Sequence, residues 1–245
     1  MNKFYYDFHI HSCLSPCGDS DNTPNNIAGM ASLCELDIVA LTDHNSAKNC
    51  PAFFAAAEKY GIIPIAGMEL TTSEDIHVVC LFENLSDALS FDEYVQQNRP
   101  GIRNKPEFFG EQLILNENDN VIGSEENLLT NATFISIDEV FSKIQEFGGF
   151  AYPAHIDRDS YSITAVLGTI PPDSEFTFFE LHDSTKTDEF SLRYGLNKNR
   201  ILISSDAHYL TSLKDRENFL LLDCEKDKPD LVRKKLFEML RNPTL

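Results

Sequence analysis

The chain has 245 residues, of which 42% are hydrophobic, enough for a substantial core in one large α/β domain or two small ones. Its 39 acidic and 20 basic side chains give a formal charge of −19, which repels long nucleic-acid duplexes and excludes broad electrostatic binding to them. No run of eighteen apolar residues and no signal-peptide pattern occurs. We therefore expect a cytoplasmic protein with no membrane segment, whose six cysteines are reduced thiols. The composition does not predict an oligomeric state.

Short apolar strands alternate with helices in the first part of the chain. The expected order is a strand at 4–9, a helix at 25–36, a strand at 38–41, an alanine-rich helix at 49–60 and a strand at 62–66. Thr23 and Pro24 are typical of a capped helix start. This alternation predicts a parallel sheet or a barrel.

The next strand is expected to run the other way. The strand 76–82 begins at Ile76, only seven positions after Glu69. A parallel pair needs a crossover of about a dozen residues or more, so these two strands should be antiparallel. The start of the second strand, with His77, then lies beside the end of the first.

The second half of the chain continues the pattern after an irregular stretch. A helix is expected at 86–97, and residues 98–133 are interpreted as an insertion that could cover the barrel, with a hairpin turn at the Asn-rich run 116–120. A helix at 136–147, strands at 150–152, 176–181, 201–203 and 218–222, and a final helix at 231–241 follow. With no linker or repeat, residues 1–245 are predicted to form one domain.

The histidines follow the strands rather than scattering along the chain. Five of the seven come just after an apolar strand, and loops that follow barrel strands share one face. The candidate metal ligands on that face are His9, His11, His44, Glu69, His77, His155, Asp206 and His208. They exceed what one tetrahedral ion uses, so we expect two or three divalent ions of zinc, manganese or iron.

Other residues have candidate roles beside these ligands. Asp43, next to His44, could orient an imidazole from behind the metal ligands, and Arg158 could bind a phosphate or pair with a neighbouring carboxylate at the barrel rim. We favour substrate contact or ligand support for His182 over metal ligation. Cys17 and Asp19 stand at ligand-compatible distances after His11, although turn residues are common there.

Five ordered motifs resemble those of the PHP (polymerase and histidinol phosphatase) family. They are Asp7-Phe8-His9-Ile10-His11-Ser12, Leu41-Thr42-Asp43-His44-Asn45, Gly67-Met68-Glu69, Ala154-His155-Ile156-Asp157-Arg158 and Ser205-Asp206-Ala207-His208. The resemblance implies a distorted (β/α)7 TIM-like barrel, a two- or three-metal centre at the C-terminal face of the strands, and phosphoesterase activity.

The same resemblance implies a division of the ligands among the ions. His9, His11, Glu69 and Asp206 would hold one ion, Glu69 would bridge to a second held by His77 and His155, and His44 and His208 would hold a third. The family commonly has a further Asp or His five or six positions after the second His of its first motif. This chain has Pro16 and Cys17 there, so Cys17 or Asp19 completes a third site or that site is weak.

The leading hypothesis is hydrolysis of a phosphate ester in a small phosphomonoester, nucleotide or short oligonucleotide, by a hydroxide that bridges metal ions. Glu69 and Asp43 would act in catalysis and Arg158 would bind the substrate. The alternatives are an amidohydrolase-like enzyme, which commonly needs a bridging Lys that no strand end supplies here, and a non-catalytic metal-stabilised regulatory domain. Duplex nucleic acid is not expected as a partner; if it binds, Arg99, Arg103 and Lys105 are the first residues to examine.

Overall fold

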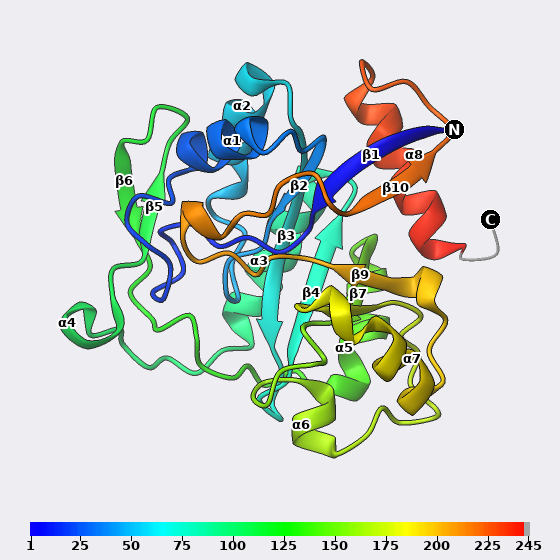
Figure 1. Cartoon of the computed structure of the whole chain (residues 1–245). Coiled ribbons are helices and arrows are strands. Elements are labelled where there is room, and N and C mark those ends of the chain that lie inside the picture. Colours follow the sequence, from blue (N-terminus) through cyan, green and yellow to red (C-terminus); the bar gives the residue numbers. More distant parts are fainter. Residues whose placement is uncertain (243–245) are drawn as a thin grey trace.

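The computed structural model describes residues 1–242 and is built around a strongly curled sheet (Figure 1). Six strands lie in the order β10-β1-β2-β3-β4-β7. Their bounds are Asn2–Asp7 (β1), Ile38–Leu41 (β2), Ile63–Thr71 (β3), His77–Phe82 (β4), Gly149–Pro153 (β7) and Phe219–Leu222 (β10). Strands β8 (Phe179–Leu181) and β9 (Ile201–Ile203) form a separate parallel pair.

Two backbone links join this pair to the sheet and close a barrel. The amide of Ile156, just after β7, donates to the Glu180 carbonyl in β8 at 2.8 Å. On the other side Ile10, just after β1, forms a parallel bridge with Ala207, just after β9. Strands β1 to β4 and β7 to β9 therefore surround one interior, which confirms the predicted distorted seven-stranded barrel. Strand β10 lies outside it, antiparallel to β1.

Strand β4 is antiparallel to β3, as the short connection predicts. Thr71 at the end of β3 pairs with His77 at the start of β4, and Glu69 pairs with Val79. Strand β4 is also antiparallel to β7. Its first residue therefore lies at the end of the barrel where the parallel strands finish.

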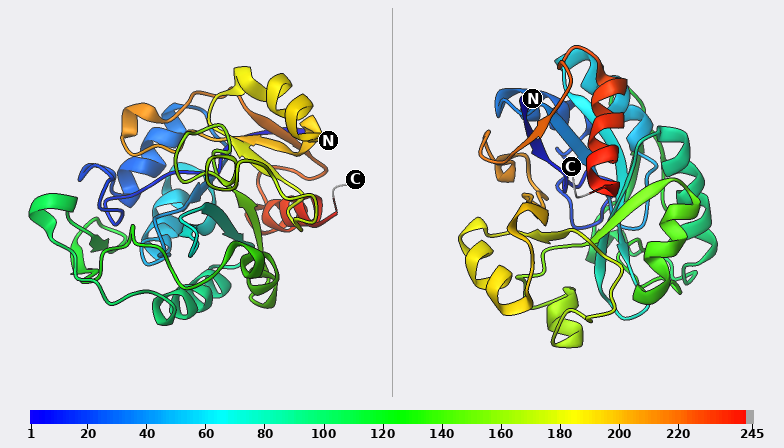
Figure 2. Two further views of the ribbon diagram at one scale, coloured as in Figure 1. Left: turned by 90° about the horizontal axis from the view of Figure 1, so that it is seen from below. Right: turned by 90° about the vertical axis from the view of Figure 1, so that its right-hand side faces the viewer.

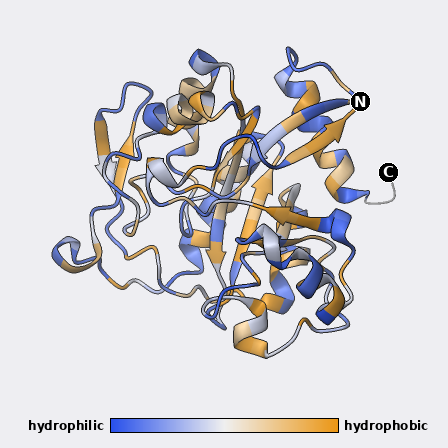
Figure 3. Cartoon of the chain, viewed as in Figure 1, coloured by the Kyte–Doolittle hydropathy of each residue, from blue (hydrophilic) through white to orange (hydrophobic). Residues whose placement is uncertain are grey.

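Helices cover the outside of the sheet (Figure 2). They are α1 (Pro24–Leu33), α2 (Cys50–Tyr60), α3 (Leu85–Gln97), α5 (Ile137–Glu146), α6 (Ile163–Leu167), α7 (Thr187–Tyr194) and α8 (Pro229–Arg241). One buried core joins α1, α2, α3 and α5 to the sheet. A second contains Tyr6, Ile65, Tyr152 and Leu202 from the barrel strands together with Leu236 of α8. Figure 3 shows hydrophobic residues concentrated on the strands.

The helix caps predicted from the sequence are present in the structure. The bounds of several helices and strands differ from the predicted ones. The Thr23 side chain accepts from the Asn26 amide, and Ser136 and Glu139 form a reciprocal capping box. Helix α1 ends three residues earlier than expected because the chain turns into a left-handed conformation at Glu35, with φ of 54°. Strand β8 keeps only the last half of the predicted 176–181, and the helices α6 and α7 were not predicted.

The insertion at 98–133 is bonded to the barrel at several points. It contains α4 (Pro106–Phe109) and the hairpin of β5 (Leu113–Leu115) and β6 (Val121–Ser124), with the predicted turn between them. The Asn45 side chain donates from Nδ2 to the Leu129 carbonyl at 2.6 Å. Buried Arg99 forms an ion pair with Glu125 at 3.1 Å, so it is not available to nucleic acid. The insertion is therefore a separate hairpin and short helix bonded to the segment that follows β2.

Two expectations from composition can be compared with the structure. Within residues 1–242, no helix is both long enough and apolar enough to cross a membrane. All six cysteines are free, as predicted. Cys17 alone among the six is exposed, and Cys224 is partly exposed.

Gly67 of β3 offers a test of the close β3–β4 packing. A Cβ at this position would lie 2.6 Å from the Cys80 carbonyl oxygen and 3.1 Å from the Thr42 methyl group. Overpacking of this kind costs about 1–3 kcal/mol, so Gly67→Ala should lower the free energy of unfolding by that amount in urea titrations. Gly123→Ala is the matched control, because its nearest neighbour would be 3.7 Å away. Equal stability of the two variants would contradict the packing.

Candidate metal centre

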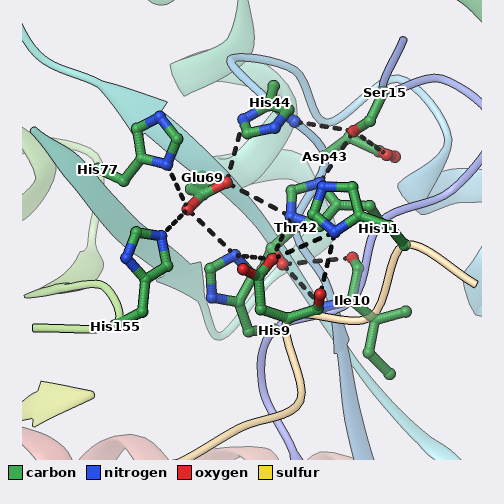
Figure 4. Close-up of polar contacts among 12 residues, drawn as sticks. His9, Ile10, His11, Ser15, Thr42, Asp43, His44, Glu69, His77 and His155 are labelled. Carbon is green, nitrogen blue, oxygen red and sulfur yellow. Dashed lines mark hydrogen bonds and ion pairs between the residues drawn. The ribbon is translucent and has the colours of Figure 1, made fainter. Parts of the chain in front are cut away.

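The carboxylate of Glu69 lies at the centre of a ring of imidazoles (Figure 4). Its Oε1 is 3.3 Å from His9 Nε2, 2.8 Å from His77 Nδ1 and 3.0 Å from His155 Nε2. Its Oε2 is 3.3 Å from His11 Nε2 and 3.0 Å from His44 Nδ1. The five histidines come from β4 and from the segments after β1, β2 and β7. The structure thus brings together residues spread over positions 9 to 155.

Asp206 forms a second carboxylate position beside the same imidazoles. Its Oδ1 is 3.1 Å from His11 Nε2 and 3.5 Å from both His9 Nε2 and His208 Nδ1. Its Oδ2 is 2.7 Å from Arg158 Nη1. All eight ligands proposed from the sequence therefore lie in one continuous cluster.

The clustered atoms have the spacing and chemistry of metal ligands. Three groups place their ligand atoms within 4.8 Å of one another: His9, His11, Glu69 and Asp206; His44, Glu69 and His77; and His11, His44 and His208. His9 Nε2 and His44 Nδ1 are buried without a hydrogen-bond partner, although buried nitrogens normally have one. Imidazole nitrogens and carboxylate oxygens in this arrangement fit divalent metal ions.

The pKa shifts differ among the proposed ligands. Burial opposes protonation of His9 and His44, but the carboxylates of Glu180 and Glu69 outweigh it and raise the pKa of both imidazoles well above the usual value, so these two histidines must lose a proton when a metal binds. His77 and Asp206 are already in the forms that bind metals. Burial outweighs the attraction of Glu69 and lowers the pKa of His77 to about 4, which leaves this imidazole neutral near pH 7. Burial opposes ionisation of Asp206, but the charge of His9 and a hydrogen bond from His11 hold the pKa of that carboxyl well below its usual range. A neutral imidazole and an ionised carboxylate are the forms that bind metals.

Glu180 of β8 supports two of the proposed ligands and was missed from the sequence. Its Oε1 accepts from His9 Nδ1 at 2.8 Å and from the His155 backbone amide at 3.1 Å. The first contact leaves His9 Nε2 free to face Glu69. The second holds His155 at an unfavourable φ of 27°. The sequence did contain a signal for Glu180: side chains alternate along a strand, so Glu180 and His182 lie on the same face of it.

Asp43 supports His11 rather than His44. Its oxygens accept from the Ser12 amide at 2.7 Å and the Ser15 hydroxyl at 2.7 Å. The Ser15 Oγ in turn accepts from His11 Nδ1 at 3.0 Å. A role for Asp43 in orienting an imidazole stays a prediction. The ring placed to receive it is that of His11, through Ser15, because the Asp43 oxygens bond to the two serines in the turn that follows His11.

A cavity of about 630 Å³ opens over the metal ligands. Arg158, Tyr161 and Phe109 line it, together with residues 128 and 130–132 of the insertion. Arg158 pairs with Asp206 rather than with its neighbour Asp157, because Asp157 accepts the backbone amides of His182 and Asp183. His182 is in none of the ligand groups within residues 1–242.

Cys17 and Asp19 occupy different positions. Cys17 lines the cavity, whereas Asp19 does not. Burial raises the pKa of the Cys17 thiol, but the charge of His44 and hydrogen bonds with His208 and His44 outweigh it and lower the pKa to about 5. The Asp19 carboxylate accepts from the Asp21 amide at 2.8 Å within its own turn.

Comparison with known proteins identifies a matching family and several proteins of similar fold. The PHP domain family matches residues 7–161. An uncharacterised protein of Methanocaldococcus jannaschii is 29% identical over 100 residues, which are 37% of this chain and 58% of that protein. The lesion-specific endonuclease PfuEndoQ from Pyrococcus furiosus superposes with a TM-score of 0.63 at 17% identity, over 98% of this chain and 56% of that one.

Two further solved structures share the fold. Endonuclease Q in complex with a 27-mer duplex substrate containing an abasic lesion has a TM-score of 0.65 at 18% identity, over 98% of this chain and 57% of that one. An amidohydrolase from Chromobacterium violaceum with bound sulfate has a TM-score of 0.58 at 19% identity, over 89% and 91% of the two chains. This chain spans a little over half of the endonucleases and of the archaeal relative.

The family match covers more than half of the chain, and the motifs within it lie around one metal-type site. The class of protein that the fold and the site define is therefore an α/β barrel with a cluster of metal-type ligands at one end. The chain belongs to the PHP domain family.

Replacing Glu180 by Ala should weaken metal binding, because it frees the His9 ring and the His155 turn. Removing a partner that lies behind a metal ligand costs roughly 10–100-fold in affinity, and competition with a chromophoric chelator would measure this loss. His182→Ala is the control, since His182 is near the cavity but outside the ligand groups. A Glu180→Ala protein with unchanged affinity, or loss of a metal equivalent from His182→Ala, would contradict these assignments.

Proposed function

We propose that this protein hydrolyses a small phosphomonoester or mononucleotide at a centre of two or three divalent ions. The arrangement of Glu69 carries the proposal. Its two oxygens face different imidazoles: Oε1 faces His9, His77 and His155, and Oε2 faces His11 and His44. A carboxylate shared in this way suits a bridge between two ions.

The residues of the chain then have distinct roles. Bound divalent ions would act as Lewis acids and lower the pKa of water to about 7. Glu180 and the Asp43–Ser15 pair hold the His9 and His11 rings with Nε2 facing the site. Arg158 lines the cavity and its side chain is 39% exposed, so N–H groups not used by Asp206 are available to a phosphate oxygen. No side-chain nucleophile is required.

Charge and the shape of the cavity favour a small substrate. Arg158 is the one Lys or Arg that lines the cavity within residues 1–242, and the whole chain has a formal charge of −19. A long run of phosphates would find few cations to neutralise it. Endonuclease Q shares this fold and was solved with a duplex, so duplex cleavage is the main competing reading.

Glu69→Gln should abolish most turnover while leaving the fold intact. Loss of a partner behind a ligand already costs roughly 10–100-fold, so loss of the central carboxylate should lower kcat by more than about 100-fold. Phosphate release from sugar phosphates and nucleotides, after reconstitution with manganese, zinc or iron, measures the activity. Elemental analysis of the wild type should find at least two equivalents of metal. Unchanged kinetics and metal content in the variant would rule out the bridge.

The substrate class can be tested by comparing kcat/KM for a nucleoside monophosphate, a short single-stranded oligonucleotide and a duplex at one salt concentration. We expect the monophosphate to be best, because one phosphate can reach the ions without bringing others against an acidic surface. A simple amide included in the series should not be cleaved. If the duplex is the best substrate, the charge argument fails; if only the amide is cleaved, the phosphoesterase proposal fails.

A further inference from the structure

The third ligand group lacks the carboxylate that the other two contain. His11, His44 and His208 place ring nitrogens within 4.8 Å of one another, whereas each of the other groups in residues 1–242 includes Glu69. His44 is only 5% exposed, and its Nδ1 already faces Glu69 Oε2 at 3.0 Å, so this histidine stands between the second and third groups. Three neutral imidazoles would leave the full charge of a divalent ion uncompensated and one tetrahedral position open.

Cys17 is the one cysteine within residues 1–242 that lines the cavity. It lines the same cavity as His44 and His208. The loop that carries it is fixed to both histidine segments: the Ser15 Oγ accepts from the His44 amide at 3.1 Å, and the Asp19 amide donates to the His208 carbonyl at 2.9 Å. Cys17 therefore lies on a loop held between two of the three imidazoles.

The loop is rigid as well as anchored. The Gly18 amide donates to the Ser15 carbonyl at 2.9 Å. A Cβ on Gly18 would lie 2.4 Å from the Ser12 carbonyl oxygen, so the turn accepts only glycine there without shifting. The neighbouring carboxylate of Asp19 is committed to its own turn. With the backbone of the loop held in this way, the Cys17 thiol moves mainly by rotation about its Cα–Cβ bond.

We propose that Cys17 is a thiolate ligand that completes a third metal site with His11, His44 and His208 and makes that site selective for a thiophilic ion such as zinc. On binding, the thiol loses its proton to water and the sulfur forms the bond to the metal. Sulfur ligands select zinc over manganese, which prefers oxygen. This inference rests on the proposed function, because it assumes that the cavity binds divalent ions.

Cobalt(II) substitution of the full chain tests the proposal without measuring activity. The metal-free protein is titrated with cobalt while the near-ultraviolet thiolate-to-cobalt charge-transfer band is recorded. The band should develop as the third site fills in the wild type and be absent in Cys17→Ser. Cys224→Ser is the matched control, because Cys224 is partly exposed and lies outside the cavity; it should keep the band.

Two more measurements distinguish failure of the thiolate ligand from failure of the proposed function. Cys17→Ser should bind zinc at the third site at least about tenfold more weakly, and Cys17→Asp should restore that equivalent without the band and shift the preference toward manganese. Zinc should also protect Cys17 of the wild type from a thiol reagent. Cobalt bound with no charge-transfer band, or a band that persists in Cys17→Ser, overturns the thiolate ligand alone. Failure of the wild type to bind any metal overturns the proposed function as well.

Discussion

The burial of one carboxylate, that of Glu69, is the constraint on which the rest of the site depends. Its side chain is 1% exposed, and within residues 1–242 no Lys or Arg pairs with it. An ionised carboxylate removed from water costs several kcal/mol unless nearby groups compensate it. Here five imidazole nitrogens within 3.3 Å of its oxygens provide the compensation. Because those histidines lie at the ends of different strands, the contacts can form together only if the sheet curls into a barrel.

The reversed direction of β4 is part of the same requirement. In a wholly parallel barrel, a histidine at the start of a strand would lie at the end opposite to the active site. The tight β3–β4 connection places His77 directly across from Thr71, two residues beyond Glu69. The absence of a side chain at Gly67 lets the neighbouring backbone of β4 approach. The antiparallel β4 thus places the histidine at its first residue in the site, which a parallel strand could not do.

Local patterns in the sequence predicted most of the helices and strands and the face of the barrel that the histidines share. Strand period, helix caps and connection length depend only on residues that are neighbours in the sequence. Which side chains form hydrogen bonds or ion pairs with each other could not be predicted from these local patterns. Glu180 finds His9 only because β8 pairs with β9 and the segment after β9 forms a bridge with the segment after β1 in the closed barrel. Arg158 pairs with Asp206, 48 positions away, because backbone amides already occupy the adjacent Asp157. The short helices α6 and α7 were missed because five and eight residues carry little periodic signal.

Under the proposed function, the distribution of charge would link metal loading to substrate binding. Lys48, and Arg99 within the insertion, both pair with Glu125. Arg158 is already paired with Asp206, so the cavity in its metal-free form presents Glu69, Asp75 and Asp206 to an approaching phosphate with little to attract it. Two or three divalent ions would reverse the sign of the field in the cavity while the outer surface stays acidic. The site would then attract a phosphate only when loaded, and the ions would control recognition of the substrate as well as its hydrolysis.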